Sequence, residues 1–160
     1  MSTADAPLPE IPHLDPPLRL LIVRAPYYRD IVEGLTRGAV TALEKAGADY
    51  DVVDVAGAYE LAQAIRLALR GSRAYDGFIA LGCVVRGETD HYTFICDAAM
   101  NGLMHLSLTY GIALGTGLLT VDTLEQARAR ARPDAPNKGT EAAVAALKQI
   151  AAGRFFGALP

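Results

Sequence analysis

The sequence predicts an α/β fold: a three-layer sandwich in which a four-stranded parallel sheet is flanked by helices. Short apolar runs of strand length alternate at least four times with segments of helical periodicity. Such alternation is typical of parallel βαβ units with right-handed crossovers. The chain has 160 residues, of which 51% are hydrophobic and 21% are charged, so one globular domain with a sizeable core is expected.

The first half of the chain supplies two predicted strands and two predicted helices. Residues 18–23 form an apolar run that predicts a buried strand. Residues 30–46 carry apolar side chains at helical spacing, and Gly47 fits the C-terminus of that helix. The second strand is predicted at residues 50–55, and the helix after it at residues 60–70.

The second half continues the alternation. Residues 78–85 form the longest apolar run and predict the third strand. A helix is predicted at residues 90–110 and the fourth strand at residues 112–120. Two helices complete the chain, a short one at residues 123–131 and a longer one at residues 137–152.

A proline-rich arm precedes the first strand. Because proline lacks a backbone donor, this arm does not form a regular central strand. We expect a mobile arm over residues 1–17 and a single domain over residues 18–160. The prolines of the arm are Pro7, Pro9, Pro12, Pro16 and Pro17.

Charge and composition exclude several classes of protein. The net charge is −3 and no basic run is present, which argues against nucleic acid as a partner. We expect no membrane contact and a cytoplasmic location, because no signal sequence and no apolar run of about 20 residues is visible. Cys83 and Cys96 are too few for a disulfide scaffold and are expected to be reduced.

The predicted strands all point the same way, so their carboxyl ends meet at one edge of the sheet, where open α/β sheets bind ligands. The third strand ends in the most informative segment of the chain. Residues 86–91 read RGETDH and combine a glycine, a hydroxyl, three charged residues and a histidine. We therefore predict a ligand site at this edge.

The segment after the third strand has two candidate functions. The backbone of Gly87, Glu88 and Thr89, with the hydroxyl, suits a phosphate, although an ordinary strand-to-helix turn has the same composition. His91 is the one histidine at a predicted strand exit, and it can transfer protons near neutral pH or serve as a structural hydrogen-bonding group.

Other candidates come from the remaining exits and helices. Glu60 can bind a sugar hydroxyl or favour a helix N-terminus. Tyr27 and Tyr59 can stack on a flat ring or join the core. Arg130 and Lys138 are of types common on surfaces. A metal site is not expected, because no pair of CxxC or HxxxH ligands occurs.

Taken together, the strand exits resemble those of the lumazine synthase family, the penultimate enzyme of riboflavin biosynthesis. The resemblance covers residues 21–155 and implies a flavodoxin-like fold. Its motifs are GAYEL at residues 57–61, LGCVVRGETDHY at 81–92, LTVD at 119–122 with EQA at 125–127, and NKG at 137–139.

The resemblance implies the condensation of 5-amino-6-(ribitylamino)uracil with 3,4-dihydroxy-2-butanone 4-phosphate. The products are 6,7-dimethyl-8-ribityllumazine, phosphate and water, and no cofactor or metal is implied. Ala56 and Ala62 stand where the family usually has proline. An alternative is therefore a catalytically weak paralogue that binds lumazine or flavin, or a scaffold subunit.

The resemblance also implies roles for individual residues. His91 matches the proton-transfer histidine, Arg130 the phosphate-binding arginine and Lys138 a basic site residue. The implied substrate-binding positions are Tyr27, Ala58, Tyr59, Glu60, Val84, Val85 and Thr116, with Gly87, Glu88 and Thr89 as the phosphate turn.

In the family, the site is built where two subunits meet, so the resemblance implies a homo-oligomer. A pentamer is favoured and a 60-subunit shell is possible. Shell-forming members add their N-terminal segment as a strand to a neighbour's sheet. The prolines of residues 1–17 remove backbone donors that such a strand needs, which favours the free pentamer.

Overall fold

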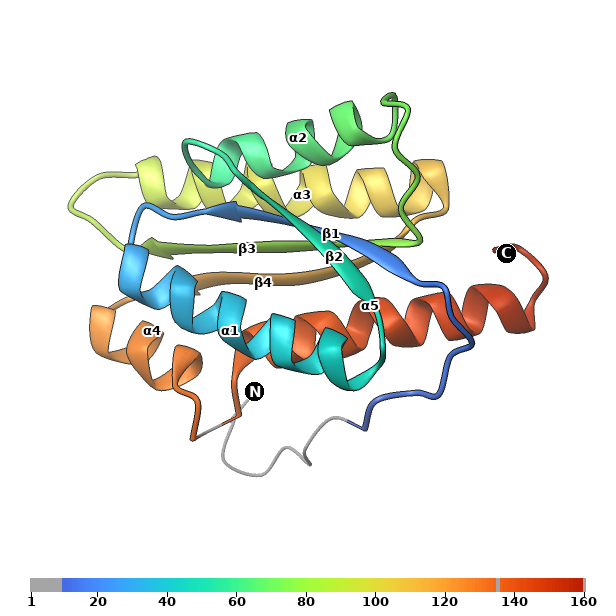
Figure 1. Ribbon diagram of the computed structural model, residues 1–160. Helices are drawn as coiled ribbons and strands as arrows, with labels where there is room; N and C mark the ends of the chain where they lie inside the picture. Colours follow the sequence, from blue (N-terminus) through green and yellow to red (C-terminus); the bar gives the residue numbers. More distant parts are fainter. Residues whose placement is uncertain (1–9, 135, 160) are drawn as a thin grey trace.

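The computed structural model describes residues 10–134 and 136–159, and within them a parallel sheet is enclosed by helices (Figure 1). The predicted alternation of strands and helices is confirmed. In chain order the elements are β1 Arg19–Ala25, α1 Arg29–Lys45, β2 Asp49–Asp54, the 3₁₀-helix η1 Ala58–Glu60, α2 Leu61–Ala68, β3 Gly77–Val85, α3 His91–Tyr110, β4 Ala113–Val121, α4 Leu124–Ala131 and α5 Lys138–Phe155.

The four strands lie in the order β2-β1-β3-β4 and every neighbouring pair is parallel. The chain thus moves from β1 out to the edge strand β2, returns across β1 to β3, and ends at the other edge with β4. All four carboxyl ends lie at the same edge of the sheet, at the left of Figure 1. This confirms that the four strand exits share one side of the molecule.

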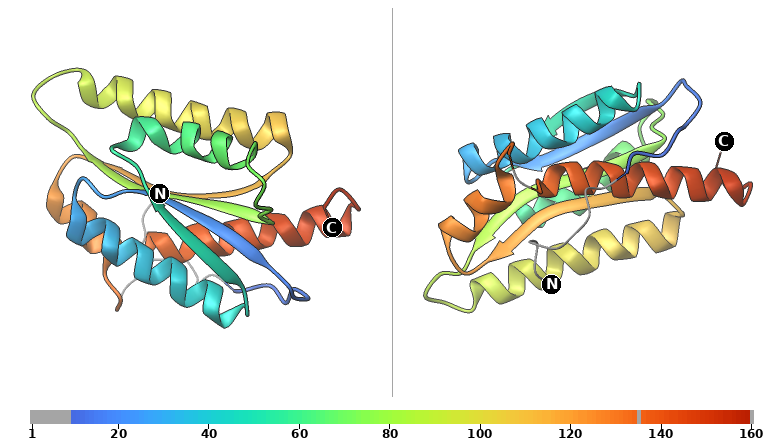
Figure 2. Two further views of the ribbon diagram at one scale, coloured as in Figure 1. Left: turned by 45° about the horizontal axis from the view of Figure 1, so that its top comes forward. Right: turned by 90° about the horizontal axis from the view of Figure 1, so that it is seen from below.

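Helices cover both faces of the sheet and produce the predicted three-layer arrangement (Figure 2). Helices α1, α4 and α5 lie on one face, and α2 and α3 lie on the other. β1 shows how the layers are held together. Leu20 and Ile22 belong to the apolar cluster under α1 and α5, whereas Leu21 and Val23 belong to the cluster under α2 and α3. Successive side chains of a strand point to opposite faces, so an unbroken apolar run fills both cores.

Close contact between α5 and β4 depends on glycine. A Cβ added to Gly115 would lie 1.9 Å from the carbonyl oxygen of Ala142, which is closer than any side chain tolerates. A Cβ on Gly117 would lie 3.1 Å from the carbonyl oxygen of Lys138. The two glycines of β4 therefore let the backbone of α5 approach the sheet directly.

The described part of the N-terminal arm contacts the domain. Leu14 is only 8% exposed and packs with Leu18 in the cluster under α1 and α5. Arg154 donates a hydrogen bond from Nη1 to the carbonyl oxygen of Asp15, over 3.0 Å. The first nine residues of the predicted arm lie outside the described residues. The prediction of a mobile arm over residues 1–17 can therefore be compared with the structure only at residues 10–17.

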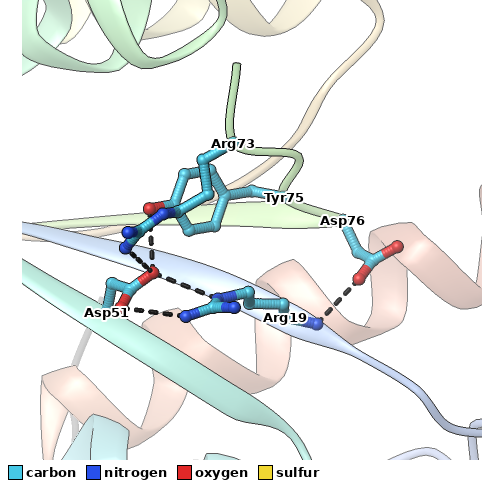
Figure 3. A network of polar contacts seen from close by, with 5 residues as sticks. All are labelled: Arg19, Asp51, Arg73, Tyr75 and Asp76. Atoms are coloured by element: carbon cyan, nitrogen blue, oxygen red, sulfur yellow. Dashed lines mark hydrogen bonds and ion pairs between the residues drawn. The ribbon is translucent and has the colours of Figure 1, made fainter. Parts of the chain in front are cut away.

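The amino-terminal edge of the sheet carries a polar network (Figure 3). The carboxylate of Asp51 accepts hydrogen bonds from Arg19 Nε (3.1 Å), Arg73 Nη1 (3.0 Å) and the Tyr75 hydroxyl (2.9 Å). The backbone N–H of Arg19 donates to the Asp76 carboxylate over 2.7 Å. These bonds, the one from Arg19 first, lower the pKa of Asp51 to about 2. The network joins β1, β2 and the segment that enters β3.

Within residues 10–134 and 136–159, none of the helices combines the length and the apolar character needed to span a bilayer.

Candidate active site

A cavity of about 590 Å³ opens at the carboxyl ends of β1, β2 and β3. Its volume lies in the range that small-molecule sites occupy. The predicted site residues that line it are Tyr27, Ala58, Tyr59, Glu60, Val84, Val85 and His91. These seven residues come from three strand exits and the start of α3, so the fold brings together positions up to 64 residues apart in the chain.

The exit of β1 provides an aromatic rim. The N–H of Tyr27 donates to the carbonyl oxygen of Ala25 over 2.9 Å, which turns the chain away from the strand. The Tyr27 ring meets the Tyr28 ring edge to face, with centroids 5.1 Å apart. Because Tyr27 is 78% exposed, its ring offers a free surface for stacking on a flat ligand.

The exit of β2 provides a carboxylate. The N–H of Glu60 donates to the carbonyl oxygen of Gly57 over 3.2 Å and closes the turn of η1. This turn brings Ala58, Tyr59 and Glu60 to the cavity wall. Among the described residues, the Glu60 carboxylate has no hydrogen bond or ion pair, so its oxygens are available to hydroxyl or N–H donors of a ligand.

The end of β3 and the start of α3 form the remaining wall. Cys83, Val84 and Val85 present an apolar surface, and His91 adds the imidazole. Burial raises the pKa of the Cys83 thiol to about 11, so the thiol stays protonated at neutral pH and is no nucleophile. The ring of His91 has no hydrogen-bond partner within the described part of the chain, which leaves both nitrogens open to substrate.

The predicted phosphate turn lies beside the cavity but does not line it. Residues 86–90 connect β3 to α3 and are exposed. Asp90 is the N-cap residue of α3, and its side chain accepts no capping hydrogen bond. The first N–H groups of α3 are therefore uncapped by this residue, and the positive end of the helix faces the same edge as the cavity.

Three predicted site residues lie apart from the cavity. Thr116 is on β4, where its hydroxyl oxygen accepts a hydrogen bond from the N–H of Leu118 over 3.3 Å. Arg130, on α4, donates from Nη1 to the carbonyl oxygen of Gln126 over 2.8 Å. Lys138 opens α5 and forms an ion pair with Glu141. All three belong to the β4 side of the molecule, and none of them lines the cavity of its own chain.

A second cavity, of about 490 Å³, lies between α1 and the connection into α5. Arg37, Lys45 and Asn137 are among its lining residues, but it contains none of the predicted site residues and no strand exit. Because the predicted site residues and the strand exits converge at the first cavity and not at the second, we assign the site to the first.

Sequence reasoning missed several lining residues. These are Ala25, Tyr28, Ala56, Gly57, Cys83 and Ile95. Their signal was position: each lies within three residues of a strand end, or one helical turn after His91. Among the described residues, no group of three or more His, Cys, Asp or Glu side chains is arranged to hold a metal ion.

Comparison with known proteins decides the family. A family model described as 6,7-dimethyl-8-ribityllumazine synthase matches residues 17–154. The chain is 46% identical to the 6,7-dimethyl-8-ribityllumazine synthase of Bartonella tribocorum, over 86% of this chain and 91% of that protein. It is 48% identical to the enzyme of that name from Nitrobacter winogradskyi, over 82% of this chain and 83% of that protein. It is 45% identical to 6,7-dimethyl-8-ribityllumazine synthase 1 of Rhizobium meliloti, over 89% and 95%.

The chain belongs to the 6,7-dimethyl-8-ribityllumazine synthase family. Membership makes it an enzyme, a transferase of riboflavin biosynthesis, which confirms the resemblance seen in the strand exits. Lumazine synthase substrates are small molecules, and a cavity of about 590 Å³ at the strand exits is of a size to hold one.

Proposed function

We propose that the cavity and the adjoining loop condense 5-amino-6-(ribitylamino)uracil with 3,4-dihydroxy-2-butanone 4-phosphate. The products are 6,7-dimethyl-8-ribityllumazine, phosphate and water. The observation that carries this proposal is the convergence of seven predicted site residues on one cavity at the strand exits. No cofactor is invoked, because amine and carbonyl groups of the two substrates supply the reacting atoms.

The pyrimidine occupies the cavity. Its ring stacks on Tyr27, whose exposed face is free, and lies against the apolar surface of Val84 and Val85. The ribityl chain carries several hydroxyl groups. The carboxylate of Glu60, which has no partner among the described residues, accepts hydrogen bonds from them. Ala58 leaves room for this chain at the start of η1.

The phosphate binds at the loop of Gly87, Glu88 and Thr89, where backbone N–H groups and a hydroxyl meet the N-terminus of α3. This loop also carries the carboxylates of Glu88 and Asp90, which oppose a dianion. A further cation is therefore required, and the arginine at the start of the loop is already paired with Asp122.

His91 transfers protons between the two substrates. Attack of the 5-amino group on the ketone forms one carbon–nitrogen bond and releases water, and loss of phosphate breaks a carbon–oxygen bond. Ring closure then forms the second carbon–nitrogen bond, to the ribitylamino nitrogen, and releases a second water. Each of these steps requires a proton to be moved, which an imidazole does near neutral pH. Holding the two substrates side by side supplies much of the remaining rate enhancement.

Arg130, Lys138 and Thr116 complete the site of a neighbouring chain. They lie on the β4 side, whereas the cavity lies at the exits of β1, β2 and β3. A chain with the cavity on one side and the cations on the other can contact a second copy head to tail, so that the cations of one copy reach the cavity of the next. Head-to-tail contacts close into rings when the rotation allows it.

An apolar surface on the helical face supports such a ring. Exposed residues on one side of α3 form it, at helical spacing. Exposed apolar patches of this kind mark interaction sites. Its members are Phe94, Met100, Met104 and Leu108.

The family resemblance favours five subunits, so we propose a free cytoplasmic pentamer of about 85 kDa, built of five 17.0 kDa chains. Leu14 and Asp15 contact their own domain, which leaves this part of the arm unavailable as a strand on a neighbour. Prolines at positions 12, 16 and 17 lack donors for such a strand. Both cysteines are free thiols, as expected in a reducing compartment.

Two measurements test the proposal. Mixing both substrates with the protein should produce the absorbance of the lumazine product, whereas absence of turnover in a folded sample favours the ligand-binding or scaffold alternative. Light scattering at moderate ionic strength should give a mass of about 85 kDa. A particle near one megadalton would contradict the free pentamer, and a stable monomer would contradict the shared site.

A further inference from the structure

The loop between β3 and α3 makes few contacts of its own. Among the described residues, the side chains of Glu88, Thr89 and Asp90 have no hydrogen bond or ion pair. A Cβ added to Gly87 would have no heavy atom of the described chain within 4 Å, apart from those of its two chain neighbours. A loop with so little packing takes its position from the residues at its two ends.

Arg86 is at the first of these ends and makes three contacts. Its backbone N–H donates to the carbonyl oxygen of Val121 over 2.9 Å, which continues the β3–β4 ladder by one bond. Its Nε donates to the carboxylate of Asp122 over 2.7 Å. Its guanidinium carbon lies 4.3 Å from the centre of the Tyr92 ring.

Tyr92 is at the other end of the loop, in the first turn of α3 and next to His91. The stacking of Arg86 on Tyr92 therefore joins the two ends of the loop to each other. The Arg86 side chain thereby fixes the distance between the end of β3 and the start of α3, which residues 87–90 connect.

Asp122 is itself held in place. Its N–H donates to the side-chain oxygen of Gln126 over 2.9 Å, and the N–H of Gln126 donates to the hydroxyl oxygen of Thr123 over 3.2 Å. Thr123 is the N-cap residue of α4, and Gln126 reaches back past it to the N–H of Asp122, in a variant of the capping box. The backbone of Asp122, whose carboxylate holds Arg86, is thus tied to both β4 and α4.

The side chains of Arg86 and Asp122 are 54% and 62% exposed. Ion pairs this exposed contribute little to the free energy of unfolding. The Arg86 side chain instead makes one hydrogen bond to Asp122 and one contact with the Tyr92 ring. These contacts are suited to holding the loop in place rather than to stabilising the core.

We propose that Arg86 is a positioning residue: through Asp122 and Tyr92, it holds the phosphate loop and the N-terminus of α3 in the place where they bind the butanone phosphate. The inference rests on the proposed phosphate site at residues 87–89. It adds a function to two residues, Arg86 and Asp122, that do not line the cavity.

The test compares Arg86→Gln and Asp122→Asn with wild type in steady-state kinetics of the assembled protein. Each variant should raise KM for the butanone phosphate about tenfold and leave KM for the pyrimidine within about twofold, because small displacements of a binding group have large effects. Arg86→Lys keeps the charge but loses the planar group, so it should restore only part of the affinity. The exchanged pair Arg86→Asp with Asp122→Arg should do better than either single charge reversal.

Arg19→Gln is the matched control. Arg19 also joins an aspartate on a neighbouring strand, Asp51, but at the opposite edge of the sheet. Its loss should leave both KM values unchanged. An equal rise of both KM values in Arg86→Gln would indicate a general structural role and overturn the proposal, as would wild-type kinetics.

Hydrogen exchange and Thr89→Ala separate the two proposals. Arg86→Gln should speed amide exchange in the peptide covering residues 86–95, and unchanged exchange would overturn the positioning role. If Thr89→Ala raises KM for the phosphate substrate but Arg86→Gln does not, the phosphate site stands and the role of Arg86 fails. If exchange speeds up while neither variant changes KM, the phosphate site itself is elsewhere.

Discussion

At the amino-terminal edge of the sheet, the Asp51 carboxylate has three donors, whereas at the carboxyl-terminal edge the Glu60 carboxylate has none among the described residues. At the first edge, hydrogen bonds of Arg19 also link β1 to β2, through Asp51, and to the segment that enters β3, through Asp76 (Figure 3). The second edge encloses a cavity of about 590 Å³. Both edges use charged side chains at strand ends. At the amino-terminal edge the Asp51 carboxylate is paired within the chain, whereas at the carboxyl-terminal edge some side chains are paired, as Arg86 is with Asp122, and those of Glu60 and His91 have no partner among the described residues.

This difference separates stability from binding. A polar group with partners in its own chain contributes to folding, and a group without partners remains available to a ligand. Substitutions at the amino-terminal edge are therefore expected to change stability, and substitutions at the carboxyl-terminal edge are expected to change kinetics. The four predictions below test this division, from the largest expected effect to the smallest.

Arg130→Ala should raise KM for the butanone phosphate about 10- to 100-fold, because a charged hydrogen bond contributes about 1.5–3 kcal/mol. KM for the pyrimidine should change little. Arg130 bonds only one backbone carbonyl within its own described chain, so the melting temperature should stay close to wild type. Arg128→Ala, two residues away on the same helix, is the control. Equal changes for both substrates would indicate a lost interface instead.

His91→Asn should lower kcat about tenfold. Proton transfer by a side chain commonly contributes about 10²-fold or more, but holding the two substrates side by side should retain part of the rate enhancement. Stability should be unchanged, since the ring has no partner in the described part of the chain. His105→Asn, further along α3 and outside the cavity, should leave kcat unaltered. Wild-type turnover in a folded His91→Asn sample would remove this residue from the mechanism.

Tyr75→Phe should lower stability by about 1 kcal/mol, because it deletes the hydrogen bond to Asp51 while the ring stays against Phe78. For a chain of this size the melting temperature should fall by about 2–4 °C. Tyr50→Phe, on β2 and next to Asp51 in the chain, is the control. The kinetic constants should not change, and a change in them would contradict the separation of the two edges.

Asp51→Asn should lower the melting temperature at neutral pH, and the difference from wild type should shrink in acid. The pKa of Asp51 is lowered from 3.8 to about 2 by its hydrogen bonds, that from Arg19 first. The stabilising contribution is therefore complete above pH 4 and is lost as the pH falls toward 2. Melting curves of both proteins at several pH values in this range measure it. A constant difference would show that the charge of Asp51 does not matter.

The layers of the fold could be predicted because apolar alternation encodes them directly. The run at Leu20, Leu21, Ile22 and Val23 fills both cores, which only a central strand of a sandwich does. Boundaries were less predictable. The helix expected over residues 60–70 is a 3₁₀ turn at Ala58–Glu60 followed by α2 at Leu61–Ala68, because the chain must turn sharply as it leaves β2.

Half of the site follows from the same logic. Once the strands are parallel, their exits must meet, and this brings His91 near Tyr27 and Glu60. The contact of Arg86 with Asp122 could not be predicted from spacing. It depends on the register that places Val85 opposite Val121, and 36 residues separate the two partners. Residue types alone do not specify the order of strands in the sheet. They therefore could not predict that Arg130 lies apart from the cavity of its own chain.

The separation of the cavity from Arg130 has a genetic consequence. In a ring, each site would take its cavity from one chain and its cation from the next, so two different defects need not disable the same site. When chains carrying His91→Asn are refolded with an equal amount of chains carrying Arg130→Ala, about one site in four combines two intact halves, by random assembly around the ring. Two alleles that are each defective should therefore complement one another within a single assembly, although neither chain contains a complete enzyme.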